Sequence, residues 1–177
     1  GDASRYIVAQ GNSYSLNPRA PLWVDVQEFE AHWRRGRMLE QARRSQEAMA
    51  EYQMAERLYQ GDFLEEDIYE EWALIRREGL LDVYLTILGK LIDSHIQSGD
   101  YQTCIDLCQK ILAKDRCRED AYQYLIICYC RLGHRSRALR WYRLCQETLR
   151  RELGCSVSPE TEALYANLIG SGTDSTP

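Results

Sequence analysis

Several features that would assign this 177-residue chain to a familiar class are missing from it. No stretch approaches 18 consecutive apolar residues, so no membrane-spanning helix is expected. The first ten residues have no basic segment followed by an apolar core, so they do not form a signal peptide. The chain also has no N-x-[ST] acceptor for N-glycosylation. These absences are typical of a cytoplasmic protein.

Motifs for catalysis and for metal binding are equally scarce. The glycines form neither the G-x-x-x-x-G-K-[ST] nor the G-x-G-x-x-G pattern of nucleotide sites. Neither C-x-x-C nor H-E-x-x-H occurs, and His32, His95 and His134 are scattered along the chain. No nucleophile therefore has a base beside it in the sequence. We expect a protein that is not an enzyme and that binds no cofactor or metal.

The seven cysteines all lie in the C-terminal half, and their number is odd. A secreted disulfide framework uses paired cysteines, so free thiols in a reducing, cytosolic compartment are expected. Cys104 and Cys108 are one helical turn apart and could contribute to a metal site, but a free cysteine also behaves as a small apolar core residue. Their coincidence with packing positions of the repeat described below favours the core.

Charge is distributed unevenly, although the net charge is only −5. Residues 61–120 carry 14 acids and 7 bases, whereas residues 121–153 carry 2 acids and 7 bases, all of them arginine. A chain with one acidic and one basic region is a candidate for docking to a partner. The acidic total opposes bulk binding to the phosphate backbone of nucleic acids.

Apolar periodicity predicts an all-α protein of about seven antiparallel helices, preceded by a short β-hairpin. Strand-forming residues and turn chemistry within residues 6–16 predict the hairpin, and the two prolines of "NPRAP" then interrupt the chain. Helical spacing of apolar residues begins at Asp25. The helices are predicted from residue 25 and over residues 45–59, 68–97, 101–113, 118–132, 135–152 and 159–169.

Capping signals separate the predicted helices. Asp25 and Glu28 form a D-x-x-E start signal, a variant of the capping box. Ser158 is the expected N-cap of the last helix, with Pro159 in its first position. The tail, residues 170–177, is expected to be disordered. The glycines that fit C-terminal caps are Gly61, Gly99, Gly133 and Gly154.

An internal repeat with a period of 34 residues organises the second half of the chain. When Gly99 is aligned with Gly133, the small and aromatic positions of two helices coincide. A weaker copy with the same spacing lies 56 residues before the first of these helices. The period and pattern are those of tetratricopeptide (TPR) repeats and predict a TPR-like helical array. The aligned sets are Ala48, Tyr52 and Ala55; Cys104, Cys108 and Ile111; and Ala138, Tyr142 and Cys145.

Six carboxylates crowd residues 62–71, with aromatic residues between them. A calcium loop needs oxygen ligands at alternate positions over twelve residues, and apolar residues interrupt that pattern here. Asp67 and Glu70 have D-x-x-E spacing, and Glu70 and Glu71 fall in the first turn of the predicted long helix. The stretch is therefore interpreted as a loop and helix start, with Trp72 facing the core.

The order and spacing of several motifs resemble the bacterial transcriptional activator domain, the TPR-like effector domain of SARP-type transcription regulators. The resemblance covers roughly residues 25–169. Arg116 stands where the family usually has proline, and Cys104 and Cys108 replace the commoner alanine and aromatic residue. The matching motifs include Gly61-Asp62-Phe63-Leu64, Trp72, Gly99-Asp100, Glu152-Leu153-Gly154 and Pro159-Glu160-Thr161.

This resemblance implies a domain organisation and a set of partners. In the family an OmpR-type winged-helix DNA-binding domain comes immediately before, and "GNSYSL" is similar to the end of its last hairpin. Residues 1–17 would then be a hairpin remnant of that domain, and promoter DNA would be bound through the missing winged helix. RNA polymerase or another protomer, as in a homodimer, would be the protein partner. The alternative is a generic TPR scaffold that binds a peptide in its concave groove.

The arginine cluster offers the candidate docking residues, namely Arg137, Arg140, Arg143 and Arg150. Arg140, Arg143 and Arg150 are spaced to share one helix face, and Glu147 falls on the same face and can pair with Arg143 or Arg150. One interpretation is a solvated helix face, since charged residues are usually outside. The other is a docking surface for DNA phosphate, for an acidic patch on RNA polymerase, or for a second protomer.

Overall fold

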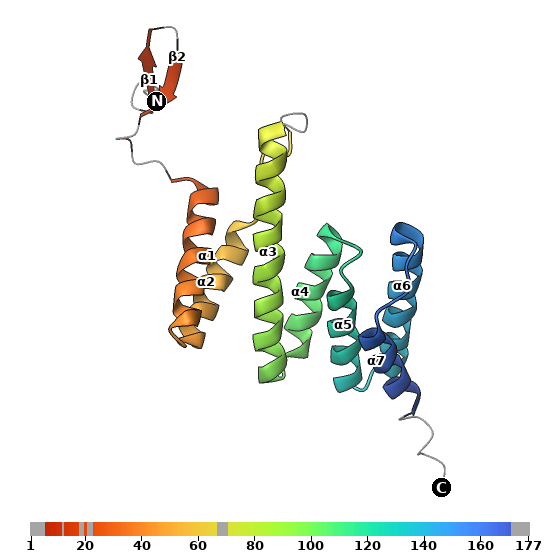
Figure 1. The fold of residues 1–177 in the computed structure, drawn as a ribbon. Coiled ribbons are helices and arrows are strands. Elements are labelled where there is room, and N and C mark those ends of the chain that lie inside the picture. The colour runs from red at the N-terminus through yellow and green to blue at the C-terminus, as the bar shows by residue number, and fades with distance from the viewer. Residues whose placement is uncertain (1–5, 12, 18–19, 21–22, 67–70, 171–177) are drawn as a thin grey trace.

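The computed structural model describes residues 6–11, 13–17, 20, 23–66 and 71–170. In this part of the chain a two-stranded antiparallel hairpin precedes seven helices, so the predicted fold class is confirmed (Figure 1). Among these residues, no helix is both long and apolar enough to cross a bilayer. The elements are β1 (Ile7–Gln10), β2 (Ser13–Leu16), α1 (Asp25–Gln41), α2 (Ser45–Leu58), α3 (Glu71–Ser98), α4 (Tyr101–Lys114), α5 (Glu119–Arg131), α6 (Arg135–Leu153) and α7 (Pro159–Gly170).

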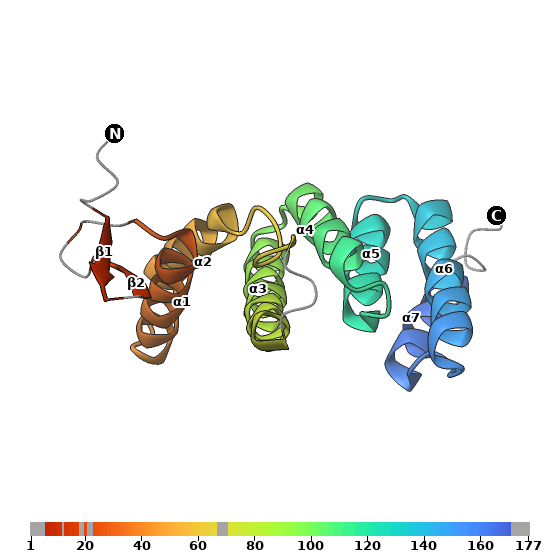
Figure 2. The same cartoon turned by 90° about the horizontal axis from the view of Figure 1, so that it is seen from above.

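The helices form a stack in which each helix lies beside the next one in the chain (Figures 1 and 2). Helices α2, α4 and α6 lie along one side of this stack (Figure 2). Helix α3 has 28 residues, twice as many as α4, and its N-terminal end extends beyond its neighbours (Figure 1). Contacts between successive helices dominate, as in repeat proteins, so each helix pair depends mainly on the pairs that flank it.

The small and aromatic residues of the repeat are all buried, which confirms the repeat positions. In the first pair, Gly36 of α1 lies against the Tyr52 ring of α2. A Cβ at position 36 would be 2.4 Å from Cε1 of that ring, so only glycine permits this contact. The Tyr52 hydroxyl donates to Glu40 at 3.0 Å, which fixes the position of the ring.

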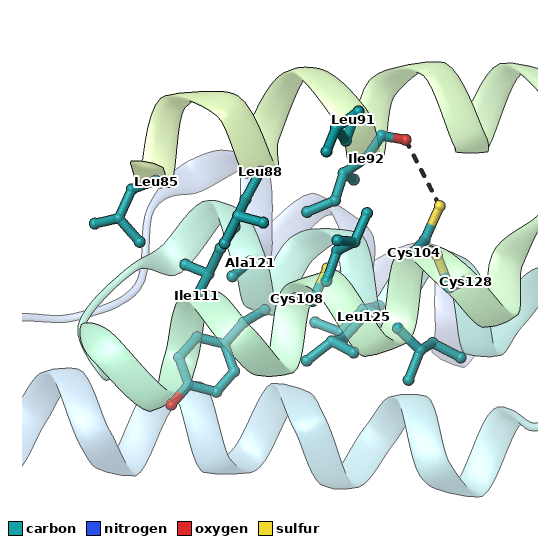
Figure 3. Packing of buried hydrophobic residues seen from close by; sticks show 14 of the residues in the cluster. Leu85, Leu88, Leu91, Ile92, Cys104, Cys108, Ile111, Ala121, Leu125 and Cys128 are labelled. Carbon is teal, nitrogen blue, oxygen red and sulfur yellow. Dashed lines mark hydrogen bonds between the residues drawn. The ribbon is translucent and has the colours of Figure 1, made fainter. Parts of the chain in front are cut away.

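In the second helix pair the large and the small residue have exchanged these two repeat positions. The 56-residue offset that relates Tyr52 to Cys108 also relates Gly36 to Ile92. Ile92 and Cys108 are both fully buried in the core that α3, α4 and α5 share (Figure 3). Each pair thus combines one large and one small residue at these positions, with the large residue on α2 in the first pair and on α3 in the second. Close packing explains why cysteine stands at position 108, where an aromatic residue is commoner.

Three of the four predicted glycine caps are confirmed by left-handed backbone, with φ of 79° at Gly99, 75° at Gly133 and 67° at Gly154. The prediction for Gly61 was wrong, because Gly61 has no positive φ. Among the described residues of that loop, Leu64 is left-handed, with φ of 48°. The Asp62 amide donates to the Glu65 carboxylate at 2.6 Å, so a side-chain hydrogen bond stabilises the turn in this loop.

Two other local predictions need correction. Helix α1 begins at Asp25 as predicted, but Val24 is its N-cap, and the Asp25 carboxylate accepts from the Val26 amide at 2.8 Å. Asp25 is therefore a first-turn residue and makes no capping box. Trp72 does not face the core, because its side chain is 60% exposed on the part of α3 that extends beyond its neighbours. Asp67 and Glu70 lie outside the described residues.

Helix α7 is tied to α5 by a group of hydrogen bonds around Glu119. The Glu119 carboxylate accepts from the Ser158 amide at 2.6 Å, the Ser158 hydroxyl at 2.7 Å and the Thr161 hydroxyl at 2.5 Å. The Ser158 hydroxyl accepts from the Thr161 amide at 3.4 Å, which confirms Ser158 as the N-cap. Burial raises the pKa of Glu119, but these hydrogen bonds outweigh it and leave the pKa below its ordinary value.

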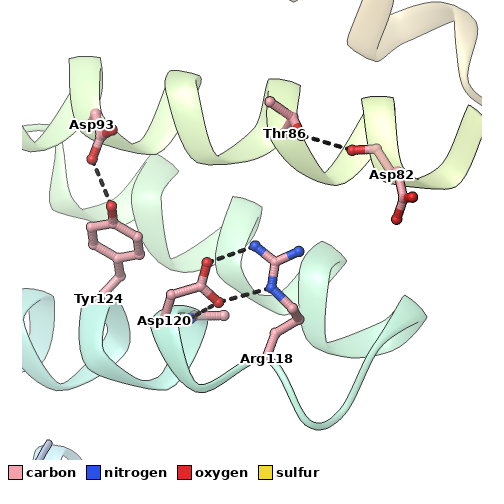
Figure 4. A network of polar contacts seen from close by, with 7 residues as sticks. Asp82, Thr86, Asp93, Arg118, Asp120 and Tyr124 are labelled. Atoms are coloured by element: carbon pink, nitrogen blue, oxygen red, sulfur yellow. Dashed lines mark hydrogen bonds and ion pairs between the residues drawn. The ribbon is translucent and has the colours of Figure 1, made fainter. Parts of the chain in front are cut away.

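Polar contacts also form between and within the middle helices (Figure 4). The Tyr124 hydroxyl of α5 donates to the Asp93 carboxylate of α3 at 2.7 Å. Arg118, at the start of α5, makes two hydrogen bonds to Asp120, of 3.0 and 2.6 Å. Several acids of the acidic region thus have partners within the fold.

Candidate partner-docking site

Helix α6 carries the predicted arginine cluster and is strongly amphipathic. Ala138, Tyr142, Cys145 and Leu149 of this helix are buried against its neighbours. At 3.6 residues per turn, the opposite face presents Arg140, Arg143 and Arg150, and all three are exposed. The structure therefore brings these three predicted residues together on one solvent-facing surface.

Arg137 lies at the edge of that surface. Its guanidinium carbon is 5.7 Å from the centroid of the Tyr129 ring, a cation–π arrangement that leaves the arginine exposed. In the described part of the chain, the guanidinium groups of Arg140, Arg143 and Arg150 make no hydrogen bond or ion pair. We call these four residues the arginine face.

Neighbouring charges leave the arginine face largely uncompensated. Glu147 is exposed on the same face, but within the described residues it forms no ion pair with Arg143 or Arg150. Arg135 and Arg151 flank the face and are engaged locally. Arg135 donates to the Ile169 carbonyl at 3.2 Å, and Arg151 pairs with Glu152 at 2.9 Å. The exposed guanidinium groups can bind carboxylates or phosphates without first breaking a buried contact.

Two described carboxylates of the acidic stretch before α3, those of Asp62 and Glu65, form contacts within the fold. Asp62 accepts from the Tyr59 hydroxyl and from Lys114 of α4, each at 2.8 Å. Burial raises the pKa of Asp62, but the hydrogen bonds from Lys114 and Tyr59 outweigh it and keep the pKa below its ordinary value. Within the part of the chain that the structure describes, no three His, Cys, Asp or Glu side chains are grouped to hold a metal ion.

The paired cysteines of α4 are core residues. Cys104 and Cys108 are both fully buried, and the Cys104 thiol donates to the Ile92 carbonyl at 3.6 Å (Figure 3). Burial raises the pKa of Cys104 to about 12, so this side chain is a thiol at neutral pH. Thiolates are the form that attacks electrophiles and binds metals, so full burial and a raised pKa favour a packing role for Cys104.

A groove beside the arginine face was missed by the sequence reasoning. It lies between α4 and α6, has a volume of about 340 Å³, and is lined by Leu112, Arg116, Trp141 and Leu144, among others. The signal available in the sequence was the pair of large apolar residues, Trp141 and Leu144, on the exposed side of an arginine-rich helix. Periodicity alone assigns such residues to a core, because it does not reveal how far apart α4 and α6 lie.

Comparisons with known proteins agree with the helical array and with the resemblance. The family model of the bacterial transcriptional activator domain matches residues 24–169. The chain is similar to the solved structure of Mycobacterium tuberculosis EmbR in complex with a low-affinity phosphopeptide, with a TM-score of 0.70 and 21% sequence identity. That similarity covers 96% of this chain but 45% of the other, so the chain spans less than half of its structural relative. No curated protein sequence matches this one.

Proposed function

The chain belongs to the bacterial transcriptional activator domain family, and on this premise we propose that it is the protein-interaction domain of a bacterial transcriptional activator. The observation that carries the proposal is the family match, which spans all seven described helices. The family is a regulatory family and not a family of enzymes. The domain would mediate dimerisation and contacts with RNA polymerase, or relay a signal to it.

The proposal places DNA recognition in a winged-helix domain that precedes the helices in the longer protein. Residues 1–17 would belong to that domain, with β1 and β2 as its last hairpin. A two-stranded hairpin is marginally stable in water and needs further strands or a helix to pack against. The described hairpin exposes Ile7 and Tyr14, which is consistent with a missing layer.

The arginine face would provide the activating contact. Its four guanidinium groups stand on one helix and are exposed to solvent, where an acidic surface could reach them and charge would steer association. A partner such as RNA polymerase or a second protomer would supply the acids. DNA phosphate is the less favoured partner because the chain as a whole is acidic.

A transcription assay tests this function. In a full-length activator that includes the winged helix, Arg140→Gln together with Arg143→Gln should reduce promoter output several-fold and leave promoter binding unchanged. Arg34 and Arg57 are exposed arginines on α1 and α2, so the double change of both to Gln is the charge-matched control. Equal output from the two double variants would contradict the role of the arginine face.

DNA binding by the isolated chain provides a second test. Fluorescence anisotropy with promoter DNA should show weak, salt-sensitive binding or none for these 177 residues, and sequence-specific binding only for the longer protein. Tight, sequence-specific binding by the isolated chain would overturn the assignment of DNA recognition to the preceding domain. Sedimentation of the same sample measures whether the helical domain dimerises.

A further inference from the structure

Two grooves occupy equivalent places in the repeat and differ in chemistry. One lies between α2 and α4, with Tyr84 of α3 among its lining residues. The other lies between α4 and α6, with Tyr122 of α5 among its lining residues. We call them the first groove and the second groove. Because the helices repeat, the side chains that line the two grooves can be compared position by position.

Ion pairs bridge the first groove. Lys110 of α4 contacts Glu56 of α2 at 2.6 Å, and Lys114 contacts Asp62 at 2.8 Å. These pairs satisfy charges on both walls and cover the apolar surface between them with the lysine side chains. Both lysines that line the first groove therefore have an acidic partner within the chain.

Apolar residues replace the first of these ion pairs in the second groove. The repeat offsets of 56 and 34 residues relate Glu56 to Leu112 and Lys110 to Leu144. Leu144 is 44% exposed, and Leu112 is half-buried. Trp141 is half-buried beside them, with its ring 6.1 Å from that of Tyr122. The second groove thus exposes apolar side chains at the place where its counterpart is bridged.

Positive charge frames the second groove. Arg116 follows α4 and Arg151 lies near the end of α6, and both line the groove, whereas no acidic residue does. Arg116 is exposed and has no ion pair with the residues that the structure describes. Arg151 pairs with its exposed neighbour Glu152, and such surface pairs contribute little and exchange readily.

On α6 the lining residues continue a stripe with heptad spacing. Arg137, Trp141, Leu144 and Arg151 are separated by steps of four, three and seven residues, which places them along one side of the helix. The stripe has arginine at each end and apolar residues in the middle. It extends over about 20 Å at 1.5 Å per residue, the length of roughly four helical turns.

We propose that the second groove binds an acidic amphipathic helix of a partner protein. An apolar side chain of that helix would insert between Leu112, Trp141 and Leu144, and carboxylates near its ends would pair with Arg116, Arg151 and Arg137. The arginines around the groove favour an acidic segment, and grooves with exposed apolar side chains commonly bind the apolar face of an amphipathic helix. The inference rests on the proposed function in one respect, that the domain is an interaction module.

Anisotropy with a defined probe tests the proposal. The probe is a fluorescein-labelled 16-residue helical peptide with leucine and phenylalanine on one face and aspartate and glutamate elsewhere. The peptide should bind the purified chain, and its affinity should fall as salt rises from 50 to 200 mM. A control peptide with lysine in place of each acid should bind at least about tenfold more weakly.

Matched variants locate the binding site. The double change Leu112→Glu and Leu144→Lys recreates the bridge of the first groove and should weaken peptide binding at least about tenfold. Leu144→Gln alone changes an exposed position and tests the same contact if the double variant unfolds. Arg116→Gln should weaken binding several-fold and reduce its salt dependence, whereas Arg34→Gln, on α1, should change neither. Circular dichroism verifies that each variant is folded.

Several results would overturn the proposal. They are the absence of peptide binding, equal binding of the acidic and basic peptides, and unchanged affinity in the two Leu144 variants. Salt-sensitive self-association that Leu144→Gln abolishes would assign the groove to a second copy of the chain instead. The measurement needs neither DNA nor polymerase, so its failure leaves the transcription assay of the arginine face as an independent test of the proposed function.

Discussion

Replacement of Gly36 by alanine is the sharpest test of the packing between α1 and α2. An added Cβ would lie 2.4 Å from Cε1, 2.7 Å from Cδ1 and 3.0 Å from Cζ of Tyr52. The ring cannot retreat easily, because Tyr52 is fully buried and its hydroxyl donates to Glu40. Lys90 of α3 in turn contacts Glu40 at 2.8 Å, so a shift of the ring would disturb three helices.

Two opposing effects decide the magnitude. Alanine is favoured over glycine in a helix by about 1 kcal/mol. Overpacking of a core costs roughly 1–3 kcal/mol, and a contact of 2.4 Å at Gly36 with a fixed ring belongs at the upper end. The expected net loss in the free energy of unfolding is about 1–2 kcal/mol, by the difference of these two effects. For a chain of this size the loss corresponds to a fall in Tm of about 3–6 °C.

Urea and thermal unfolding, followed by circular dichroism, measure the effect. Gly89→Ala in α3 is the matched control, because a Cβ there meets nothing within 4 Å, and it should stabilise the protein by about 0.5–1 kcal/mol. In a Tyr52→Leu background the cost of Gly36→Ala should largely disappear, since the ring is gone. If Gly36→Ala were neutral or stabilising in the otherwise natural chain, the argument from close approach would be refuted.

Two further predictions concern other contacts. Glu119→Gln should lower the free energy of unfolding at pH 7 by about 1–2 kcal/mol. Urea titrations at several pH values should show this difference shrinking as the pH falls through the lowered pKa of Glu119, because the wild-type carboxylate is then protonated. A difference that grew on acidification would contradict the hydrogen-bonding of Glu119 to Ser158 and Thr161. Cys108→Phe should destabilise the protein by about 1–3 kcal/mol in thermal unfolding, because the large Ile92 stands where the first pair has Gly36. An unchanged Tm would mean that Ile92 and the residue at position 108 do not compete for space.

The sequence was sufficient where structure depends on local spacing. Helix bounds follow from periodicity and caps, and the described bounds lie within about three residues of the predicted ones, apart from the end of α1, for which no position was predicted. The repeat identified the buried residues because the small and aromatic positions have to recur wherever two helices approach closely. Gly99 and Gly133 were predictable as caps because a left-handed residue there requires no information from distant parts of the chain.

Predictions from the sequence failed where the burial of a residue depends on whether a neighbouring helix covers it. Trp72 follows the apolar period of α3 but lies on turns that extend beyond the neighbouring helices, so it is exposed. The second groove was not predicted either. Its apolar residues lie on different helices, and the pattern of apolar residues within one helix does not give the distance to another helix. The repeat could have revealed the groove by comparison, since Leu112 and Leu144 stand where Glu56 and Lys110 form an ion pair.

The uneven distribution of charge also gains a structural meaning. In the acidic region, Asp62 pairs with Lys114, Asp93 accepts from Tyr124, and Asp100 caps α4, so these carboxylates stabilise the helical stack. On α6, in contrast, Arg140 and Arg143 point to solvent and have no ion pair within the described residues. Arginines that made only a solvated surface would need no particular arrangement. Their concentration on one helix, beside a groove with exposed apolar side chains, supports the proposal that this surface receives an acidic partner.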